Sequence, residues 1–270
     1  MQFWFDWLPT DIKRLVDCAL DCCWQDLDRL LRLLRWQQNS AFRINTRSAL
    51  SASYWRVDDG LFHLIPERSS ETKAYSTGET GCFGWSEAER LDFDQLWPRV
   101  EVREPLAHEL RNEAETLLYH APRSALLIAA TALEVGVKGH VSHVLPKAEW
   151  IMFHVPSPPI FKILRDYLPR LHGDGTRIVD WAALNPLFKN CQRLIEDRNS
   201  LTHAGSNIAS SDIRNHLATV SDVLYVLDYI DGHDWAAEHL SRGVRKLLDL
   251  PEPRHLYQPV EISVLQGPGV

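Results

Sequence analysis

The sequence predicts a mainly α-helical bundle with a small, mixed N-terminal region that contains a short β-hairpin. From about residue 104 onward, apolar residues recur at helical spacing, and prolines or glycines separate the segments. The clearest alternation of polar and apolar residues lies earlier, in the stretch SYWRVDDGLFHLI. We therefore expect an N-terminal region of helix, hairpin and loop at 1–100, a helical bundle at 101–250 and a C-terminal tail at 251–270.

The N-terminal region is expected to begin with a long helix. Thr10 can cap a helix that runs to about Gln38. Apolar residues recur along it at helical spacing, at Leu15, Cys18, Leu27, Leu30, Leu31 and Leu34. Asp59-Gly60 then supplies a two-residue turn for the hairpin. Residues 66–84 are rich in Ser, Thr, Glu and Gly, which is typical of a surface loop.

The acidic segment SEAERLDFDQLWPRV predicts the next helix. Ser86, followed three residues later by Glu89, is a capping-box start, and the helix should end before Pro98. Prolines and glycines divide the rest of the chain into further helices. These are expected near 104–120, 122–145, 159–171, 183–204, 210–231 and 234–248.

The helix expected at 122–145 should lie in the middle of the bundle. It begins with proline in its first turn and is apolar on nearly every face from 125 to 137. Glu134 is the lone carboxylate in this run, and a buried carboxylate needs a partner. Lys138 is one candidate, four residues on, and Arg198 is a more distant one.

Composition and charge narrow the class of protein. The 45% hydrophobic and 24% charged residues are typical of a soluble globular chain. The net charge of −7 counts against a protein that coats nucleic acid without specificity, because such binding depends on neutralising phosphates. The first residues lack a secretory leader's basic start, and the apolar run at 125–133 is too short for a membrane span. We expect a cytoplasmic protein without a membrane partner.

No cofactor or metal site is expected. The five cysteines include Cys18, Cys22 and Cys23 on the first predicted helix, which we interpret as core-facing thiols in a reducing compartment. His140 and His143 could share a helix face but have no third ligand nearby in the sequence. The phosphate-binding patterns GxxxxGK[ST] and GxGxxG and the nucleophile pattern GxSxG are absent.

One stretch of the chain has the residues to contact RNA. No acidic residue occurs between Asp28 and Asp58, while six arginines do, interleaved with aromatic residues. Such a stretch could follow a phosphate backbone and stack a base, or it could be a helix with leucines inward and arginines in water. The arginines are Arg29, Arg32, Arg35, Arg43, Arg47 and Arg56.

The segment RNSLTHAG, at the end of the helix expected at 183–204, carries the candidate catalytic residues. Arg198 is a fixed cation that can bind phosphate oxygens bidentately, and His203 can exchange a proton near neutral pH. Asn199 shares a helix face with His203 and could orient the imidazole or hold a phosphate oxygen. Gly205 is expected to end the helix.

These groups suit the cleavage of RNA without a metal. The 2′-hydroxyl can attack the adjacent phosphorus if one group removes its proton, another protonates the leaving 5′-oxygen and a cation stabilises the charged intermediate. One chain offers only one histidine in such a setting, so a twofold dimer would supply both proton-transfer groups. The expected product carries a 2′,3′-cyclic phosphate.

The region around 104–250 resembles the HEPN superfamily, of the uncharacterised prokaryotic, ApeA-like sort. Its ribonuclease members carry an arginine, a polar residue and then a histidine at a helix end, matched here by Arg198, Asn199 and His203. Their earlier helix resembles SALLIAATALEVGVK, with a glutamate where Glu134 stands. The resemblance implies an all-α homodimer that cleaves RNA without metal. It also implies a role in toxin–antitoxin or antiphage defence, with an antitoxin or another defence protein as partner.

Two other functions stay open. Some members of that superfamily have lost catalysis and act as RNA-binding or dimerisation modules. A helical scaffold unrelated to RNA would use Arg198 and His203 only to cap the C-terminal end of a helix. The intact motif favours the enzyme over the module, whereas the net negative charge favours the module.

Overall fold

The described part of the chain is mainly helical, as the sequence predicts. The structure is a computed structural model that describes residues 10–37, 39, 53–56, 62–65, 87–154, 159–171, 177–206 and 208–252. The long helices are α1 (Thr10–Gln37), α3 (Glu87–Leu96), α4 (Leu106–Leu117), α5 (Pro122–Val144), α8 (Asn185–Ala204) and α9 (Ser210–Ile230). The shorter elements are β1 (Ser53–Arg56), β2 (Phe62–Ile65), η1 (Pro146–Ala148), α6 (Glu149–His154), α7 (Ile160–Lys162), η2 (Ile163–Tyr167), η3 (Leu168–Arg170), η4 (Asp234–His239) and α10 (Arg242–Leu247).

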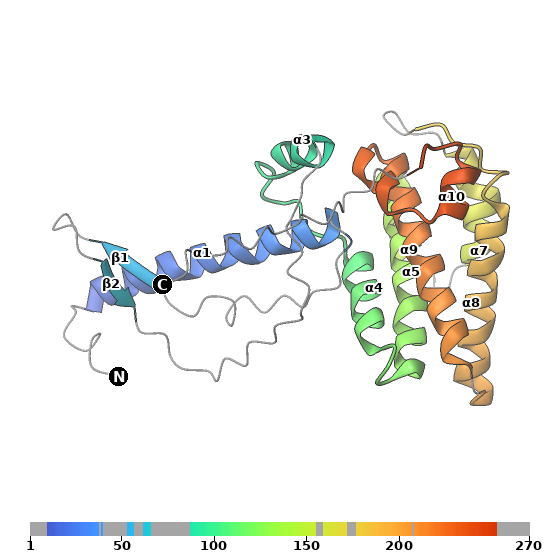
Figure 1. Ribbon diagram of the computed structural model, residues 1–270, viewed down its shortest axis with the longest axis horizontal. Coiled ribbons are helices and arrows are strands. Elements are labelled where there is room, and N and C mark those ends of the chain that lie inside the picture. The colour runs from blue at the N-terminus through green and yellow to red at the C-terminus, as the bar shows by residue number, and fades with distance from the viewer. Residues whose placement is uncertain are drawn as a thin grey trace, which may run out of the picture.

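The bundle is built around α5. Helices α4, α8 and α9 all pack against it, and they run side by side along its length (Figure 1). Ala125, Ala129, Leu133 and Val137 recur every four residues and are all fully buried. Each buried leucine of this kind stabilises the fold by roughly 1.5–3 kcal/mol relative to an exposed one. The expected central position of this helix is confirmed, although Leu127 on another face is 40% exposed.

Helix α5 also has the length and composition of a membrane span. It is the one helix in the described part of the chain that does, and half of its most apolar window is buried inside the bundle. A core helix of a soluble protein meets the same test, so this property is weak evidence for a membrane.

Two glycines of α5 have very different surroundings. A Cβ atom added at Gly136 would clash with Leu224 Cδ2 on α9 and lie 3.2 Å from Ala107 Cβ on α4. A Cβ atom added at Gly139 would meet nothing within 4 Å. Gly136 therefore allows α4 and α9 to approach the central helix closely.

We expect Gly136→Ala and Gly139→Ala to change stability in opposite directions. Gly136→Ala should lower the free energy of unfolding by about 1–3 kcal/mol, because Leu224 must move within a packed interior. Gly139→Ala should raise it by about 1 kcal/mol, because alanine has the higher helix propensity and the space is open. Denaturant unfolding of both variants measures these changes. If Gly136→Ala stabilised the protein as much as Gly139→Ala, the close approach at Gly136 would be disproved.

The C-terminal end of α1 is held against the bundle by residues far away in the sequence. Trp36 Nε1 donates to Asp228 Oδ2 at 2.9 Å, and the hydroxyl of Tyr225 donates to the Trp36 carbonyl at 3.2 Å. His239 Nε2 lies 2.5 Å from the carbonyl oxygen of Gln37. The carbonyls that a helix leaves unpaired at its end therefore find partners on α9 and η4.

Aromatic and acidic side chains enclose the same junction. Trp36 packs edge-on against Trp235, with 5.2 Å between ring centroids. Trp235 Nε1 donates to Asp92 Oδ2 at 2.7 Å, and His233 Nδ1 lies 3.2 Å from Asp92 Oδ1. Burial alone would raise the pKa of Asp92, but the hydrogen bond from His233 keeps it below its ordinary value. Helix α3 is thereby tied to η4 and α1.

Several elements differ from the expectation or lie beyond it. The helix expected at 234–248 is instead two, η4 and α10, because Ser241 starts a new helix by accepting from the Val244 N–H at 3.4 Å. Helix α6 occupies a stretch that the sequence indicated only as a connection. Strands β1 and β2 pair antiparallel, with Tyr54 opposite Leu64. The residues between them lie outside the described chain, as do 66–84 and 253–270, so the hairpin turn stays a prediction.

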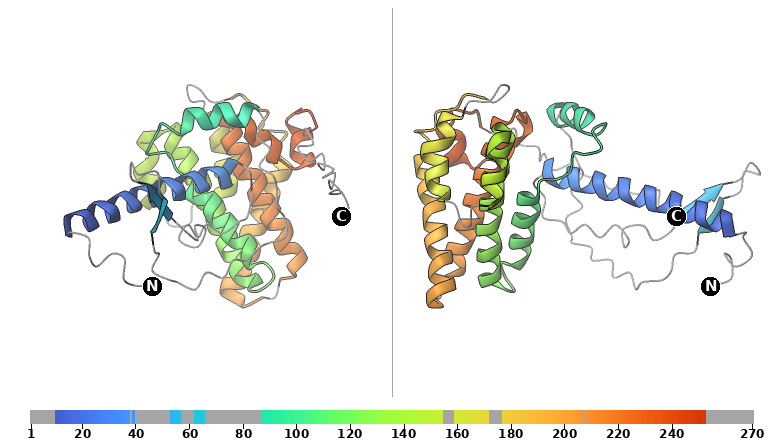
Figure 2. Two further views of the ribbon diagram at one scale, coloured as in Figure 1. Left: turned by 60° about the vertical axis from the view of Figure 1, so that its left-hand side comes forward. Right: turned by 180° about the vertical axis from the view of Figure 1, so that it is seen from behind.

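The cysteines of α1 do not face a core. Cys18, Cys22 and Cys23 are all exposed, so the interpretation as core-facing thiols is wrong. The physical reason is that only the C-terminal end of α1 meets the bundle, while its first half extends away from it (Figures 1 and 2). Cys191 on α8 is buried, and burial raises the pKa of its thiol, which therefore stays protonated.

Candidate functional site

Helix α8 carries the RNSLTHAG segment at its C-terminal end. Phe188, Cys191 and Leu194 are buried at helical spacing and fix one face of α8 against the bundle. Gly205 ends the helix with a φ of 62°, the left-handed conformation that glycine adopts without strain. The expected end of the helix is confirmed, and it places the candidate residues in the last two turns.

The three candidate catalytic residues lie close together in sequence but have different environments. Arg198 and Asn199 are half-buried, whereas His203 is exposed. Arg198 Nη1 donates to Asn199 Oδ1 at 2.9 Å. Asn199 and His203 are four residues apart on a continuous helix and so share one side of it.

Arg198 and His203 leave the helix in different directions. Five residues of a regular α-helix correspond to a rotation of about 140° between the two side chains. The last turn is not loosened to bring them together, because α8 stays helical to Ala204 and Thr202 Oγ1 donates to the Arg198 carbonyl at 2.7 Å. Within one chain, the side chains of Arg198 and His203 therefore face different surroundings.

Glu134 pairs with Lys138, the nearer of its two candidate partners. Lys138 Nζ lies 2.7 Å from Glu134 Oε1, one turn along α5. No hydrogen bond or ion pair among the described residues links Glu134 with Arg198. The carboxylate is 24% exposed, so it sits at the edge of the core, where an i, i+4 pair is sufficient to compensate its charge.

Two arginines of the predicted RNA-contacting stretch belong to the core. The side chain of Arg35 is 8% exposed, and its Nε lies 2.9 Å from both carboxylate oxygens of the fully buried Glu104. Neither Arg35 nor Arg29 can reach a phosphate backbone, which corrects the RNA-binding prediction for these two residues. Arg29 is 9% exposed and donates to the backbone carbonyls of Leu96, Trp97, Arg99 and Val102.

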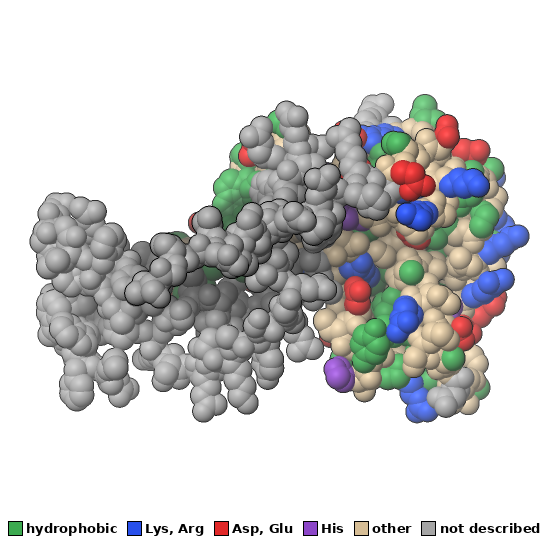
Figure 3. Space-filling view, viewed as in Figure 1, with side chains coloured by type: hydrophobic (Ala, Val, Ile, Leu, Met, Phe, Trp, Pro, Cys, Tyr) green, Lys and Arg blue, Asp and Glu red, His purple; other side chains and the backbone are tan. Residues whose placement is uncertain are grey.

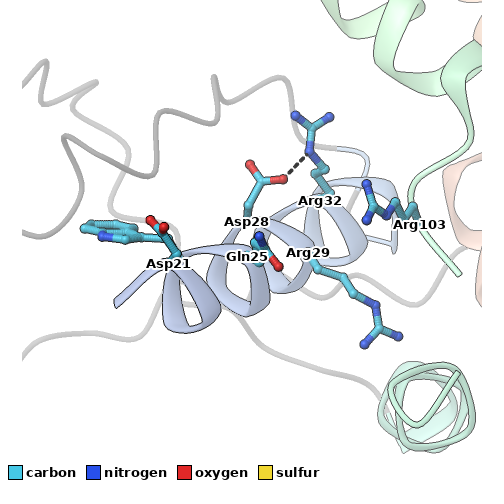
Figure 4. Close-up of a pocket in the computed structure, with 7 residues that line it drawn as sticks. Asp21, Gln25, Asp28, Arg29, Arg32 and Arg103 are labelled. Atoms are coloured by element: carbon cyan, nitrogen blue, oxygen red, sulfur yellow. Dashed lines mark hydrogen bonds and ion pairs between the residues drawn. The ribbon is translucent and has the colours of Figure 1, made fainter. Parts of the chain in front are cut away.

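Arg32 lies on another side of α1 and is already paired. It contacts Asp28 at 2.7 Å and Glu109 on α4 at 2.8 Å. Figure 4 shows Arg29 and Arg32 leaving the helix in opposite directions. Between α1 and Arg103 lies a polar pocket of about 270 Å³, to which acidic and basic side chains both contribute.

The other arginines of that stretch give no described basic surface. Arg43 and Arg47 lie outside the described residues, and Arg56 ends β1, where only the backbone is described. On the face of the bundle seen in Figure 3, basic and acidic side chains are interspersed. That mixture offers no continuous basic track for phosphates on this face.

The structure has a polar groove between α8 and α9 that the sequence did not predict. His216 Nε2 on α9 lies 2.7 Å from Asp197 Oδ2 on α8, and the His216 side chain is only 9% exposed. The pair lines a groove of about 510 Å³, which we call the α8–α9 groove. Helical spacing could have shown one polar stripe on each helix, but not that the two stripes face each other. The other lining residues are Asn190, Arg193, Glu196, Asp212, Asn215, Ala218 and Thr219.

No metal centre is evident among the residues that the structure describes. No group of three or more His, Cys, Asp and Glu side chains is placed there to hold an ion. His140 instead lies 3.0 Å from Asp231 through its Nδ1, and His143 is exposed. The two histidines therefore have separate surroundings.

Comparisons with protein-family models, with curated proteins and with solved structures found no match for the chain. Its function has to be inferred from the residues and their geometry.

Proposed function

We propose that the chain is a metal-independent endoribonuclease of the HEPN type, in which Arg198, Asn199 and His203 act on RNA. The observation that carries the proposal is their placement in the last two turns of α8, with His203 exposed and Arg198 beside Asn199. An exposed imidazole can reach a substrate that approaches the end of the bundle, and the neighbouring guanidinium supplies a phosphate-binding cation. No cofactor takes part in this chemistry.

The proposed reaction uses the nucleophile of the substrate. The imidazole of one His203 removes the proton of a 2′-hydroxyl, whose oxygen attacks the adjacent phosphorus. Arg198 binds the non-bridging oxygens and stabilises their added charge, and a second imidazole, protonated, gives its proton to the leaving 5′-oxygen. The products are a 2′,3′-cyclic phosphate and a free 5′-hydroxyl.

A homodimer is part of the proposal. The reaction needs two proton-transfer groups, and one chain has one histidine in the motif. Because Arg198 and His203 diverge by about 140° along α8, a second copy can bring its His203 to the Arg198 of the first. We further propose that the dimer acts in the cytoplasm, in a toxin or antiphage defence system with an antitoxin or another defence protein as partner.

The product ends test the proposal. The purified chain in EDTA should cleave single-stranded or loop RNA and leave 2′,3′-cyclic phosphate ends, because the attacking oxygen belongs to the RNA. DNA of the same sequence should resist, because it lacks the 2′-hydroxyl. Mass spectrometry of the fragments identifies the ends. Cleavage that requires a divalent metal, or that cuts DNA equally, would exclude this mechanism.

A non-catalytic HEPN module that binds RNA or mediates dimerisation is the second candidate. Two observations favour it: the Arg198 guanidinium is already bonded to Asn199 within its own chain, and the net charge is −7. This module would form a dimer or bind RNA but leave it intact. A chain that neither binds nor cleaves RNA and stays monomeric would instead indicate a helical scaffold unrelated to RNA.

A further inference from the structure

The α8–α9 groove collects polar side chains that are not used elsewhere in the fold. The guanidinium of Arg193, the carboxylate of Asp212 and the amides of Asn190 and Asn215 all line it. Among the described residues, none of these four side chains makes a hydrogen bond or an ion pair. Exposed side chains on facing helices can satisfy these groups with water or with a ligand, and their convergence on one hollow favours a ligand.

One group at the base of the groove is fixed in position. His216 is nine-tenths buried, and Asp197 holds its Nε2 at 2.7 Å. Its other ring nitrogen, Nδ1, has no hydrogen-bond partner in the described chain. This atom is not fully enclosed by the protein. Nδ1 is therefore at least partly accessible, and the contact with Asp197 holds the imidazole in place before a molecule enters the groove.

The charge of the groove decides against a phosphate as its occupant. One cation, Arg193, stands among three carboxylates, Glu196, Asp197 and Asp212. Such a surplus of negative charge repels an anion at close range. A neutral, planar molecule with several hydrogen-bond donors is the better match, and the groove has the volume of an ordinary small-molecule site.

Among the four bases of RNA, guanine matches the groove best. Its O6 and N7 are adjacent acceptors, which an arginine contacts bidentately. On the neighbouring Watson–Crick edge, N1–H and the N2 amino group are adjacent donors, which suit the two oxygens of a carboxylate. Arg193 on α8 and Asp212 on α9 line the groove from two different helices, so each can address one of these two neighbouring edges of one base.

We propose that the α8–α9 groove binds an unpaired guanine base. Resting on the proposed ribonuclease function, this guanine lies close to the cleaved phosphate in the RNA chain. Asp197 and His203 are six residues apart on α8, a rise of about 9 Å, so a base in the groove and the reacting phosphate belong to one short stretch of RNA. The groove then sets which sequences are cut.

Binding of short labelled RNAs in EDTA tests the proposal directly. The RNAs are uridine pentamers with G, A, C or U at the central position, and the protein carries His203→Ala so that no RNA is consumed. We expect the guanine RNA to bind about tenfold more tightly than the adenine RNA. Arg193→Ala and Asp212→Asn should each reduce this preference to less than about threefold, because each removes one bidentate contact. Arg242→Ala, at a 77% exposed position on α10, should keep it.

The outcomes separate the groove from the nuclease. Equal binding of all four RNAs, or a guanine preference that survives both groove variants, overturns the proposal. If the chain without substitutions cuts no RNA but the His203→Ala protein prefers guanine, the nuclease is wrong and the groove stands. Free GMP and AMP as competitors identify the source of the base. If GMP displaces the labelled guanine RNA and AMP does not, the groove is a site for a free nucleotide. If neither mononucleotide displaces it and only unlabelled guanine RNA does, the groove recognises a base within a strand.

Discussion

Replacement of His203 by alanine should reduce RNA cleavage by about 10²–10⁴-fold while leaving the fold intact. The imidazole is exposed and makes no hydrogen bond in the described part of the chain, so its loss removes the proposed proton-transfer group and few other interactions. The free energy of unfolding should change by less than about 0.5 kcal/mol. Single-turnover cleavage rates and denaturant unfolding measure the two effects. His143→Ala, an exposed histidine on α5, is the matched control and should cleave normally.

Arg198→Lys is the companion variant for the cation. Lysine keeps the positive charge but cannot present the planar fork of donors, so we expect a loss of about 10²-fold in rate. Arg242→Lys on α10 makes the same exchange at an exposed site and should change nothing. If His203→Ala cleaved as fast as the unaltered chain, His203 would be excluded as a proton-transfer group. A normal rate for Arg198→Lys would exclude the bidentate role of the arginine.

Arg35→Met should cost the fold about 3–5 kcal/mol, because it leaves a buried carboxylate without its cation. Glu104 is fully buried, and Arg35 contacts both of its oxygens. The one other hydrogen bond to this carboxylate in the described chain, from Asn112 Nδ2 at 3.1 Å, cannot replace a full charge. Arg14→Met on the exposed first half of α1 is the control and should be near neutral. Arg35→Met combined with Glu104→Leu should recover most of the loss, because no buried charge remains.

The loss in Arg35→Met should depend on pH. Burial raises the pKa of Glu104, and Arg35 opposes that rise. Without Arg35, the pKa of Glu104 in the folded state rises further. Below the ordinary glutamate pKa of about 4.3, Glu104 is protonated in both the folded and the unfolded state, so its burial carries no charge penalty. Stability is then lost as pH rises through the folded-state pKa. Unfolding measured at pH 4 and pH 7 should show the smaller deficit at pH 4. An equal deficit at both would mean that the charge of Glu104 is not the cause.

Local signals were sufficient for the long helices of the bundle, although not for α6 or for the break between η4 and α10. The end of α8 at Ala204 follows from Gly205, and the central position of α5 follows from its apolar run, because both depend on neighbours within one or two turns. The same reasoning located Arg198, Asn199 and His203 at a helix end. It also identified Lys138 as one of two partners for Glu134, since an i, i+4 pair can be read from spacing alone.

Contacts between distant segments could not be predicted in this way. Arg35 and Glu104 are 69 residues apart, and no local pattern distinguishes an arginine that enters the core from one that faces water. The exposure of Cys18 depends on where α1 leaves the bundle, which its own periodicity does not specify. Asp197 and His216 each look like surface residues until α8 and α9 are packed together.

The contacts at the end of α1 impose an order on folding during synthesis. The carbonyls of Trp36 and Gln37 have to wait for these contacts until Tyr225 and His239 have been synthesised. The two partners are 189 and 202 residues further along the chain. At a synthesis rate of about 5–20 residues per second, that wait lasts roughly 10–40 s. The bundle helices from α4 to α9 emerge one after another and can pack within this interval, because their contacts are closer in sequence. Among the described helices, α1 is thus made before the bundle and is among the last to dock, and a ribosome that stalls before residue 239 leaves its end uncapped.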